Sequence, residues 1–174
     1  MDKIICSGAL FYSLTTERFL LLYRTKKSTN NTNCWGLVGG KNEGSETPWQ
    51  GLQREIEEEI GFIPEIKKTI PLESFISSDN NFSFHTYLCL INEEFIPRLN
   101  KEHSSYAWCS FSHWPKPLHT GLANTLRSKT NKNKLETTEY QKNHPGGNIG
   151  YNLKKVDTII NKSFQKIILN ENIK

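Results

Sequence analysis

The chain has 174 residues, which suits one compact domain with its own core and leaves little room for a second domain. Apolar residues make up 36% and charged residues 23% of the sequence, fractions that are ordinary for a globular protein. The net charge of +4 is compatible with phosphate-bearing substrates, but by itself it is too small to indicate a nucleic-acid-binding protein.

Membrane and export signals are not evident. No apolar run approaches the ~20 residues that cross a bilayer. Residues 1–5 lead directly into strand-like sequence, without the basic and then apolar pattern of a secretion signal. The four cysteines are scattered and form no CxxC pair: Cys6, Cys34, Cys89 and Cys109. We therefore expect a cytoplasmic protein with reduced thiols and no membrane partner.

Two of these cysteines raise the question of a zinc site. His85 and Cys89 are separated by three residues, and so are Cys109 and His113. Zinc ligands usually come from tight turns or helix starts, whereas both pairs lie in strand-like or aromatic sequence. We therefore favour ordinary packing of these four side chains over a metal site.

Three strand-like segments open the chain, at residues 4–12, 19–24 and 34–38. Thr15–Arg18 is typical of a hairpin turn between the first two, and the polar, Asn-rich residues 26–33 indicate a loop. The third segment ends at Gly39–Gly40, where we expect a turn that lets the backbone approach its surroundings closely.

A helix is well marked after this turn. Thr47 is a good N-cap, Pro48 suits the first helical position, and Gln50 completes a Thr-x-x-Gln capping box. Gly61 is placed to end the helix. The apolar residues recur at helical spacing and form one stripe: Trp49, Leu52, Ile56 and Ile60. The sequence therefore predicts an amphipathic helix over residues 48–60.

Further strands are predicted at residues 73–77, 82–91 and 106–111, and a second helix over residues 118–127. In the longest of these strands, alternate residues from Phe82 to Leu90 would share one face. Strands that surround helices in this order indicate an α/β sandwich.

The composition changes after Arg127. Residues 128–148 are polar, with many Lys, Asn and Thr, and we expect a long loop there. Apolar residues between 156 and 168 then recur at helical spacing, which predicts a C-terminal amphipathic helix packed on the domain.

The most informative stretch runs from Gly40 to Phe62. Glu55 lies three residues before Glu58 and four before Glu59, so on a helix the three carboxylates project from one face. Crowded negative charges repel one another unless a cation lies among them, and oxygen ligands suit hard ions such as Mg²⁺ or Mn²⁺. The apolar stripe lies about 100° around the helix from this face, so both can be used at once. A solvated acidic helix face is the alternative interpretation of these glutamates taken alone.

The spacing of the whole stretch is G-x5-E-x7-R-E-U-x-E-E-x-G-U, where U is a bulky apolar residue. This pattern resembles the Nudix box at every fixed position from Gly40 to Phe62, although an aliphatic residue is more usual at Phe62. Many relatives also have a proline where Val38 stands, a change that removes no ligand. The resemblance implies an α/β Nudix fold, in which a mixed sheet is sandwiched between helices, and assigns residues 1–127 to the Nudix core. Composition and apolar spacing assign residues 128–174 to a polar loop and a C-terminal helical extension on the same domain.

The resemblance also implies a metal site. Glu55, Glu58 and Glu59 would hold Mg²⁺, with Mn²⁺ as a substitute, and the carbonyl of Gly40 would assist. Family members differ over which glutamate acts as the base, so Glu55 and Glu58 are catalytic as well as metal-binding candidates. The cofactor expected from the resemblance is therefore a divalent cation.

Three further residues complete the expected catalytic set. Arg54 would pair with Glu46 or a neighbouring carboxylate and fix its orientation. A carboxylate from a later loop often serves as the base or as an extra ligand, and Glu102 is the candidate here. The alternative for Glu102 is an ordinary exposed loop charge.

The substrate pocket must come from other elements, because relatives share the catalytic residues and differ in the substrate that they bind. Four residues are candidates, each with core packing or ordinary surface as the alternative: Arg24, Phe84, Trp108 and His119. The resemblance implies hydrolysis of the phosphoanhydride linkage of a nucleoside diphosphate joined to another moiety, either a nucleoside triphosphate or a nucleotide-sugar. An RNA cap-removing hydrolase and a catalytically silent nucleotide-binding regulator are the alternatives. The expected partner is a small-molecule nucleotide, and the oligomeric state is left open, a homodimer included.

Overall fold

The computed structural model describes residues 3–26, 32–111 and 113–143. The chain divides into two compact units, Met1–Arg127 and Ser128–Lys174, and each is described by itself. The predicted packing of the second unit on the first stays a prediction.

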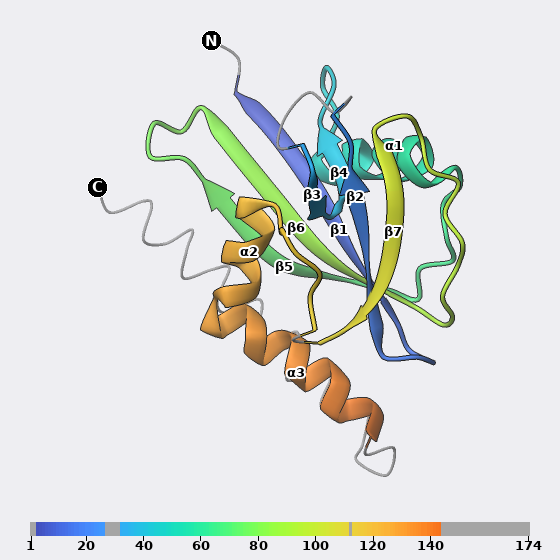
Figure 1. Ribbon diagram of the computed structural model, residues 1–174. Coiled ribbons are helices and arrows are strands. Elements are labelled where there is room, and N and C mark those ends of the chain that lie inside the picture. The colour runs from blue at the N-terminus through green and yellow to red at the C-terminus, as the bar shows by residue number, and fades with distance from the viewer. Residues whose placement is uncertain (1–2, 27–31, 112, 144–174) are drawn as a thin grey trace. The chain divides into compact units, whose positions relative to one another are not determined.

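Seven strands in the described part of the first unit form one mixed sheet. They are β1 (Ile4–Ser13), β2 (Arg18–Arg24), β3 (Cys34–Gly36), β4 (Val38–Lys41), β5 (Lys68–Ile76), β6 (Phe82–Ile91) and β7 (His103–Ser110). The main path through the sheet is β3-β2-β1-β6-β5, while β4 pairs with β1 and β7 pairs with β2. The β1–β6 pair is parallel and the other pairs are antiparallel, so the centre of the sheet joins segments far apart in sequence (Figure 1).

The predicted turn at Gly39–Gly40 is wrong, because both glycines lie inside β4. Gly39 pairs with Gly8 and Gly40 pairs with Ser7 of β1. Gly39 has a φ of 139°, and a Cβ atom there would lie 2.1 Å from the carbonyl oxygen of Ser7. A glycine is needed at this point for a close approach between two strands, and not for a reversal of the chain.

Helix α1 (Pro48–Ile60) begins and ends as the sequence predicts. The side chain of Thr47 accepts a hydrogen bond from the backbone N–H of Gln50, and the Gln50 side chain accepts one from the N–H of Thr47, so the capping box is confirmed. Gly61 ends the helix in the left-handed conformation, with a φ of 82°.

The main core fills the space between the sheet and α1. Its buried members come from one face each of β1, β2, β4 and β6 and from α1: Ala9, Phe11, Leu20, Leu22, Val38, Leu52, Ile56, Ile60, Cys89 and Ile91. Side chains alternate between the two faces of a strand, so Phe84 and Thr86 of β6 point away from α1. They line a cavity together with Leu122 of helix α2 (Thr120–Arg127), which therefore covers the opposite face. The first unit is thus the predicted α/β/α sandwich, and Figure 1 shows both helices against the sheet.

Two strands are longer than the sequence predicts. β5 begins at Lys68 and continues through Pro71, because the pairing with β6 shifts by one residue between Pro71 and Glu73. A bulge of this kind accommodates a proline that cannot donate to the ladder. β7 begins at His103, because its first residues pair with the end of β2.

The second unit corrects the expected loop at residues 128–148. Residues Lys129–Asn143 form helix α3. This segment contains no proline or glycine, and the first such residues are Pro145, Gly146 and Gly147. A polar composition therefore did not exclude a helix here. The predicted C-terminal helix between residues 156 and 168 lies outside the described residues.

No helix within the described ranges is long and apolar enough to cross a membrane.

Candidate active site

Arg54 lies among the carboxylates of the Gly40–Phe62 box and hydrogen-bonds to three of them. Its Nε and Nη2 atoms donate to the two carboxylate oxygens of Glu46 at 3.0 and 3.2 Å, so this pair is bidentate. Its Nη1 atom donates to Glu55 at 3.0 Å and to Glu58 at 3.3 Å. The hydrogen bond to Glu46 is the main reason why the pKa of Arg54 is raised, and Arg54 in turn lowers the pKa of Glu46. The guanidinium group therefore orients three carboxylates from one point.

Glu59 is the most buried carboxylate of the box, with 3% of its surface exposed. Its Oε2 atom accepts a hydrogen bond of 2.7 Å from the backbone N–H of Gly39, and its Oε1 atom lies 3.7 Å from Nε2 of His103. Burial raises the pKa of Glu59 to about 8, although the Gly39 hydrogen bond opposes this shift. Without a cation nearby, Glu59 therefore holds its proton at neutral pH.

Glu55 fits into a space that a glycine leaves open. A Cβ atom at Gly40 would lie 2.6 Å from the carboxylate carbon of Glu55, so any larger residue would push this carboxylate away. Burial raises the pKa of Glu55, Arg54 lowers it, and the charges of Glu58 and Glu102 raise it further. Strand β4 and helix α1 thus bring the backbone of Gly40 and the carboxylate of Glu55 close together.

Glu102 reaches this site from the segment that precedes β7. Its carboxylate lies 3.8 Å from Nη2 of Arg24, and its charge raises the pKa values of both Glu55 and Glu59. The pairing of β2 with β7 places Arg24 opposite His103, the residue next to Glu102. The sheet therefore brings Glu102 close to the helix carboxylates.

The chemistry of this site fits a hard divalent cation. The side-chain ligands are carboxylate oxygens, and Gly40 leaves room beside them. Burial and, to a smaller extent, repulsion between the carboxylates raise the pKa values of Glu55 and Glu59. Within the part of the chain that the structure describes, no group of three or more His, Cys, Asp or Glu side chains already surrounds one point. Arg54 and the Gly39 N–H hold the carboxylates in hydrogen bonds instead, so side-chain rotations are needed to gather them.

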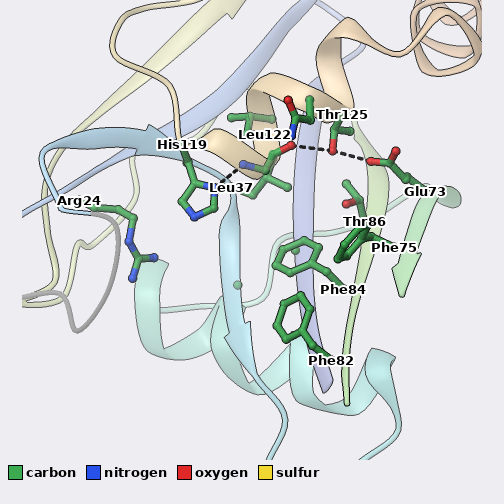
Figure 2. Close-up of a pocket in the computed structure, with 15 residues that line it drawn as sticks. Arg24, Leu37, Glu73, Phe75, Phe82, Phe84, Thr86, His119, Leu122 and Thr125 are labelled. Atoms are coloured by element: carbon green, nitrogen blue, oxygen red, sulfur yellow. Dashed lines mark hydrogen bonds between the residues drawn. The ribbon is translucent and has the colours of Figure 1, made fainter. Parts of the chain in front are cut away.

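A cavity of about 280 Å³ lies on the α2 side of the sheet. Figure 2 shows the rings of Phe82 and Phe84 along it, with Arg24 and His119 on the left of the view. Phe84 packs closely against β1, because a Cβ atom at Gly8 would lie 3.0 Å from its ring. The wall of the cavity is therefore largely aromatic, with charged and polar groups at its ends.

Arg24 belongs to both the cavity and the carboxylate site. It lines the cavity, and it is also the ion-pair partner of Glu102. Its Nε atom is buried and has no hydrogen-bond partner among the described residues. A buried N–H without a partner is costly, so this atom is a strong candidate to bind an anionic ligand.

His119 lies at the start of α2, on the cavity side. Its Nδ1 atom accepts a hydrogen bond of 3.1 Å from the backbone N–H of Gly121, which fixes the ring. Burial lowers the pKa of His119, and the neighbouring positive charge of Arg24 lowers it further. The imidazole is therefore neutral at physiological pH, and because Nδ1 is the acceptor, it presents Nε2–H as a donor.

The structure brings together three of the four substrate-binding candidates, since Arg24, Phe84 and His119 all line the cavity. Trp108 does not line it and packs against the core on the α1 side. Its ring meets that of Phe95 edge to face at 5.4 Å, and its Nε1 donates to the carbonyl of Phe95 at 3.1 Å. β7 turns this side chain toward α1 and away from this cavity, and a substrate-binding role for Trp108 stays a prediction.

Glu73 and Thr125 also line the cavity, and they were not singled out from the sequence. The bulge in β5 decides which way Glu73 points, and its partner Thr125 comes from a helix 52 residues later. A single carboxylate in a strand carries no spacing signal of its own. Strand alternation could have placed Thr86 beside Phe84, but it could not have identified the opposing helix.

Comparisons with known proteins identify the family and the fold. The family model described as the NUDIX domain matches residues 7–128. No curated protein matches the chain significantly. Among solved structures, a MutT NUDIX hydrolase from Burkholderia pseudomallei is 25% identical, with a TM-score of 0.56, and the alignment covers 74% of this chain and 99% of that chain.

Two further structures share the fold. The MutT protein from Methanosarcina mazei Go1 is 22% identical over 76% of this chain and 95% of that chain, with a TM-score of 0.60. The Nudix hydrolase RenU from M. smegmatis is 21% identical over 73% of this chain and 83% of that chain, with a TM-score of 0.61. The family match covers most of the chain and includes the whole Gly40–Phe62 box. The chain therefore belongs to the NUDIX domain family and is a Nudix hydrolase, an enzyme that acts on phosphoanhydride bonds of nucleoside diphosphate-linked substrates.

Proposed function

We propose that this chain is a Mg²⁺-dependent hydrolase that cleaves the diphosphate linkage of a nucleoside triphosphate or a nucleotide-sugar. One observation carries the proposal: Arg24 lines the cavity and at the same time lies 3.8 Å from Glu102, beside the box carboxylates. A nucleotide in the cavity would therefore have its phosphates next to the carboxylates. The products would be a nucleotide together with pyrophosphate or the phosphate of the second moiety.

The cation would be held by Glu55, Glu58 and Glu59, with the carbonyl of Gly40 as a further ligand. The space at Gly40 and the raised pKa values of the half-buried Glu55 and the buried Glu59 support this assignment. When bound, Mg²⁺ or its substitute Mn²⁺ would supply neutralisation of phosphate charge and a lower pKa for the attacking water.

The remaining roles belong to the residues around these ligands. Arg54 would orient Glu55 and Glu58, and its bidentate pair with Glu46 would fix the guanidinium group itself. Glu102 would accept the proton of the attacking water, because it lies near the helix carboxylates and is only partly exposed.

The cavity would hold the nucleoside part. Aromatic rings such as Phe84 provide a stacking surface for a base, and the unpaired Nε–H of Arg24 provides a donor for a phosphate. His119 would contribute a neutral hydrogen-bonding group beside Arg24. We accordingly propose a small-molecule nucleotide as the partner and, from the scattered cysteines without a CxxC pair, a cytoplasmic location.

The test is a panel of nucleotides assayed with Mg²⁺ for phosphate release after coupling to a phosphatase. It would contain canonical and oxidised nucleoside triphosphates, nucleotide-sugars, ADP-ribose and dinucleoside polyphosphates. Glu58→Gln is the inactive variant, and Glu57→Gln is its matched control, because Glu57 is the neighbouring, exposed glutamate of the same helix and has no place in the site.

Turnover of one class that is lost in Glu58→Gln and retained in Glu57→Gln would support the proposal. Running the reaction in ¹⁸O-labelled water and locating the label in the products by mass spectrometry would identify the phosphorus that is attacked. Turnover that is equal in both variants would contradict the metal assignment. If folded protein hydrolyses no nucleotide in the panel, the small-nucleotide proposal is contradicted. Hydrolysis of capped RNA, or ligand binding without hydrolysis, would then be favoured.

A further inference from the structure

The end of the cavity away from Arg24 contains a carboxylate that the proposed chemistry does not use. Glu73 of β5 faces Thr125 of α2 there, as Figure 2 shows on its right side. The hydroxyl of Thr125 is 2.5 Å from Oε2 of Glu73 and 3.1 Å from the carbonyl of Gly121. The carboxylate is therefore held in one orientation by a helix that packs over the cavity.

The second oxygen of this carboxylate is available to a ligand. Among the described residues, Oε1 of Glu73 accepts no hydrogen bond, and Glu73 has no ion-pair partner. A fixed carboxylate in a largely apolar cavity needs donors from elsewhere, either water or a bound molecule. Its position beside an aromatic wall indicates that the molecule is flat and carries N–H groups on its edge.

The aromatic wall has the form of a stacking surface. The ring of Phe84 lies against the backbone of Gly8, where a side chain would leave no room for it. Phe82 and Phe84 are both partly exposed and both line the cavity, so ring surface remains free for a ligand. Bases in single nucleotides are commonly recognised by stacking on such rings and by hydrogen bonds to their Watson–Crick edge.

We propose that Glu73 is the residue that selects guanine as the base of the substrate. This inference rests on the proposed function, because it places the phosphates at Arg24 and the base at the opposite end of the cavity. Guanine presents two adjacent donors, the N1–H and the N2 amino group. They match the free Oε1 of Glu73 and the second lone pair of Oε2, whose first lone pair accepts from Thr125. Adenine and cytosine present one amino group beside a ring nitrogen acceptor, and uracil presents one N–H between two carbonyls. An ionised carboxylate is repelled by those acceptors, so guanine is the best match.

The test compares diphosphates that differ only in the base edge. GDP, IDP and ADP are titrated into the full-length protein with Mg²⁺ by calorimetry, and IDP lacks only the N2 amino group of GDP. We expect GDP to bind about tenfold more tightly than IDP, and more tightly still than ADP. Glu73→Gln keeps the size of the side chain and removes its charge. The ratio of GDP affinity to IDP affinity should therefore fall to about two. Glu65→Gln is the control, because Glu65 is an exposed carboxylate with 81% of its side chain accessible and pairs with Lys67.

A second variant separates selection from simple support of the fold. Thr125→Val removes the hydroxyl that orients Glu73 and keeps the shape of the side chain, so the GDP-to-IDP ratio should fall partway while ADP binding stays unchanged. Equal binding of GDP and IDP by the wild-type protein would overturn the inference. So would a Glu73→Gln variant that keeps the wild-type ratio of GDP affinity to IDP affinity.

This experiment distinguishes failure of the inference from failure of the proposed function. Selective binding of GDP without any hydrolysis would leave the role of Glu73 in place and would contradict the proposed reaction. Hydrolysis with no preference among bases would leave the reaction in place and would contradict the role of Glu73.

Discussion

The carboxylate of Glu59 accepts a 2.7 Å hydrogen bond from the backbone N–H of Gly39, which joins the last turn of α1 to the glycine pair of β4. This contact links the strand that supplies one expected metal ligand, the Gly40 carbonyl, to the helix that supplies the others. Glu59 is also buried, so ionisation of its carboxylate should lower the stability of the metal-free protein.

The metal-free protein should become less stable as the pH rises through neutrality. Burial raises the pKa of Glu59 from 4.5 to about 8, so the folded state keeps a proton that the unfolded chain releases. The stabilisation is complete below pH 4.5 and is lost as the pH approaches 8. In EDTA, the melting temperature should fall by roughly 5 °C between pH 6.5 and pH 8.

The choice of pH range avoids a second group with the opposite effect. Burial lowers the pKa of His103 to about 4 from 6.5, so stability due to its neutral form is lost only as the pH falls below 6.5. The melting temperature of Glu59→Gln should change little over this pH range, whereas that of Glu57→Gln should fall as in the wild-type protein. A decline of equal size in the Glu59→Gln protein would contradict the assignment.

Gly40→Ala should impair metal binding and leave the fold intact. The added Cβ would lie 2.6 Å from the end of the Glu55 side chain, which can rotate away without moving the backbone. We expect Mg²⁺ affinity to fall by roughly 10- to 100-fold, as for loss of a group that orients a ligand, with little change in melting temperature. Titration of Mg²⁺ against activity measures the first quantity. An unchanged Mg²⁺ dependence would show that the Glu55 carboxylate is not a ligand.

Arg54→Lys should lower kcat more than it raises KM. Lysine keeps the positive charge and loses the bidentate pair with Glu46 and the second pair of contacts to Glu55 and Glu58. We expect a loss of kcat of about 10- to 100-fold. Arg18→Lys is a matched control, because Arg18 makes a similar bidentate pair with Glu94 outside the site. Equal losses in both variants would indicate a general effect on the fold.

Trp108→Phe should affect stability and not substrate affinity. The change removes the Nε1–H that donates to the carbonyl of Phe95 and part of the packing in the α1 core. The cost should be about 1–3 kcal/mol of unfolding free energy, measured by chemical denaturation. KM for the preferred nucleotide should stay within a factor of about two. A large rise in KM with unchanged stability would instead support Trp108 as a substrate-binding residue.

The sequence could predict the helix of the box because its signals are local. Thr47, Gln50 and Gly61 define its two ends, and the carboxylate spacing places three glutamates on one face. The strands were also predictable from their apolar runs. The structure adds the pairing of β1 with β6, which joins residues that no local pattern connects.

The candidate site was less predictable where it depends on that pairing. Glu102 approaches the box only because β7 lies beside β2, and Glu73 reaches the cavity only because of the bulge after Pro71. The direction of Trp108 was unpredictable for the same reason, since it depends on which face of β7 the residue occupies. Residues with a fixed spacing on one element could be found from the sequence, and residues that meet across the sheet could not.

The most direct test of the account is the rate of nucleotide hydrolysis by Glu58→Gln at saturating Mg²⁺, relative to Glu57→Gln and the wild-type protein. We expect a loss of at least about 100-fold in kcat for Glu58→Gln, with Glu57→Gln within about twofold of wild type. Comparable activity of all three proteins, with melting temperatures that match, would contradict the proposal that the helix carboxylates hold the catalytic metal.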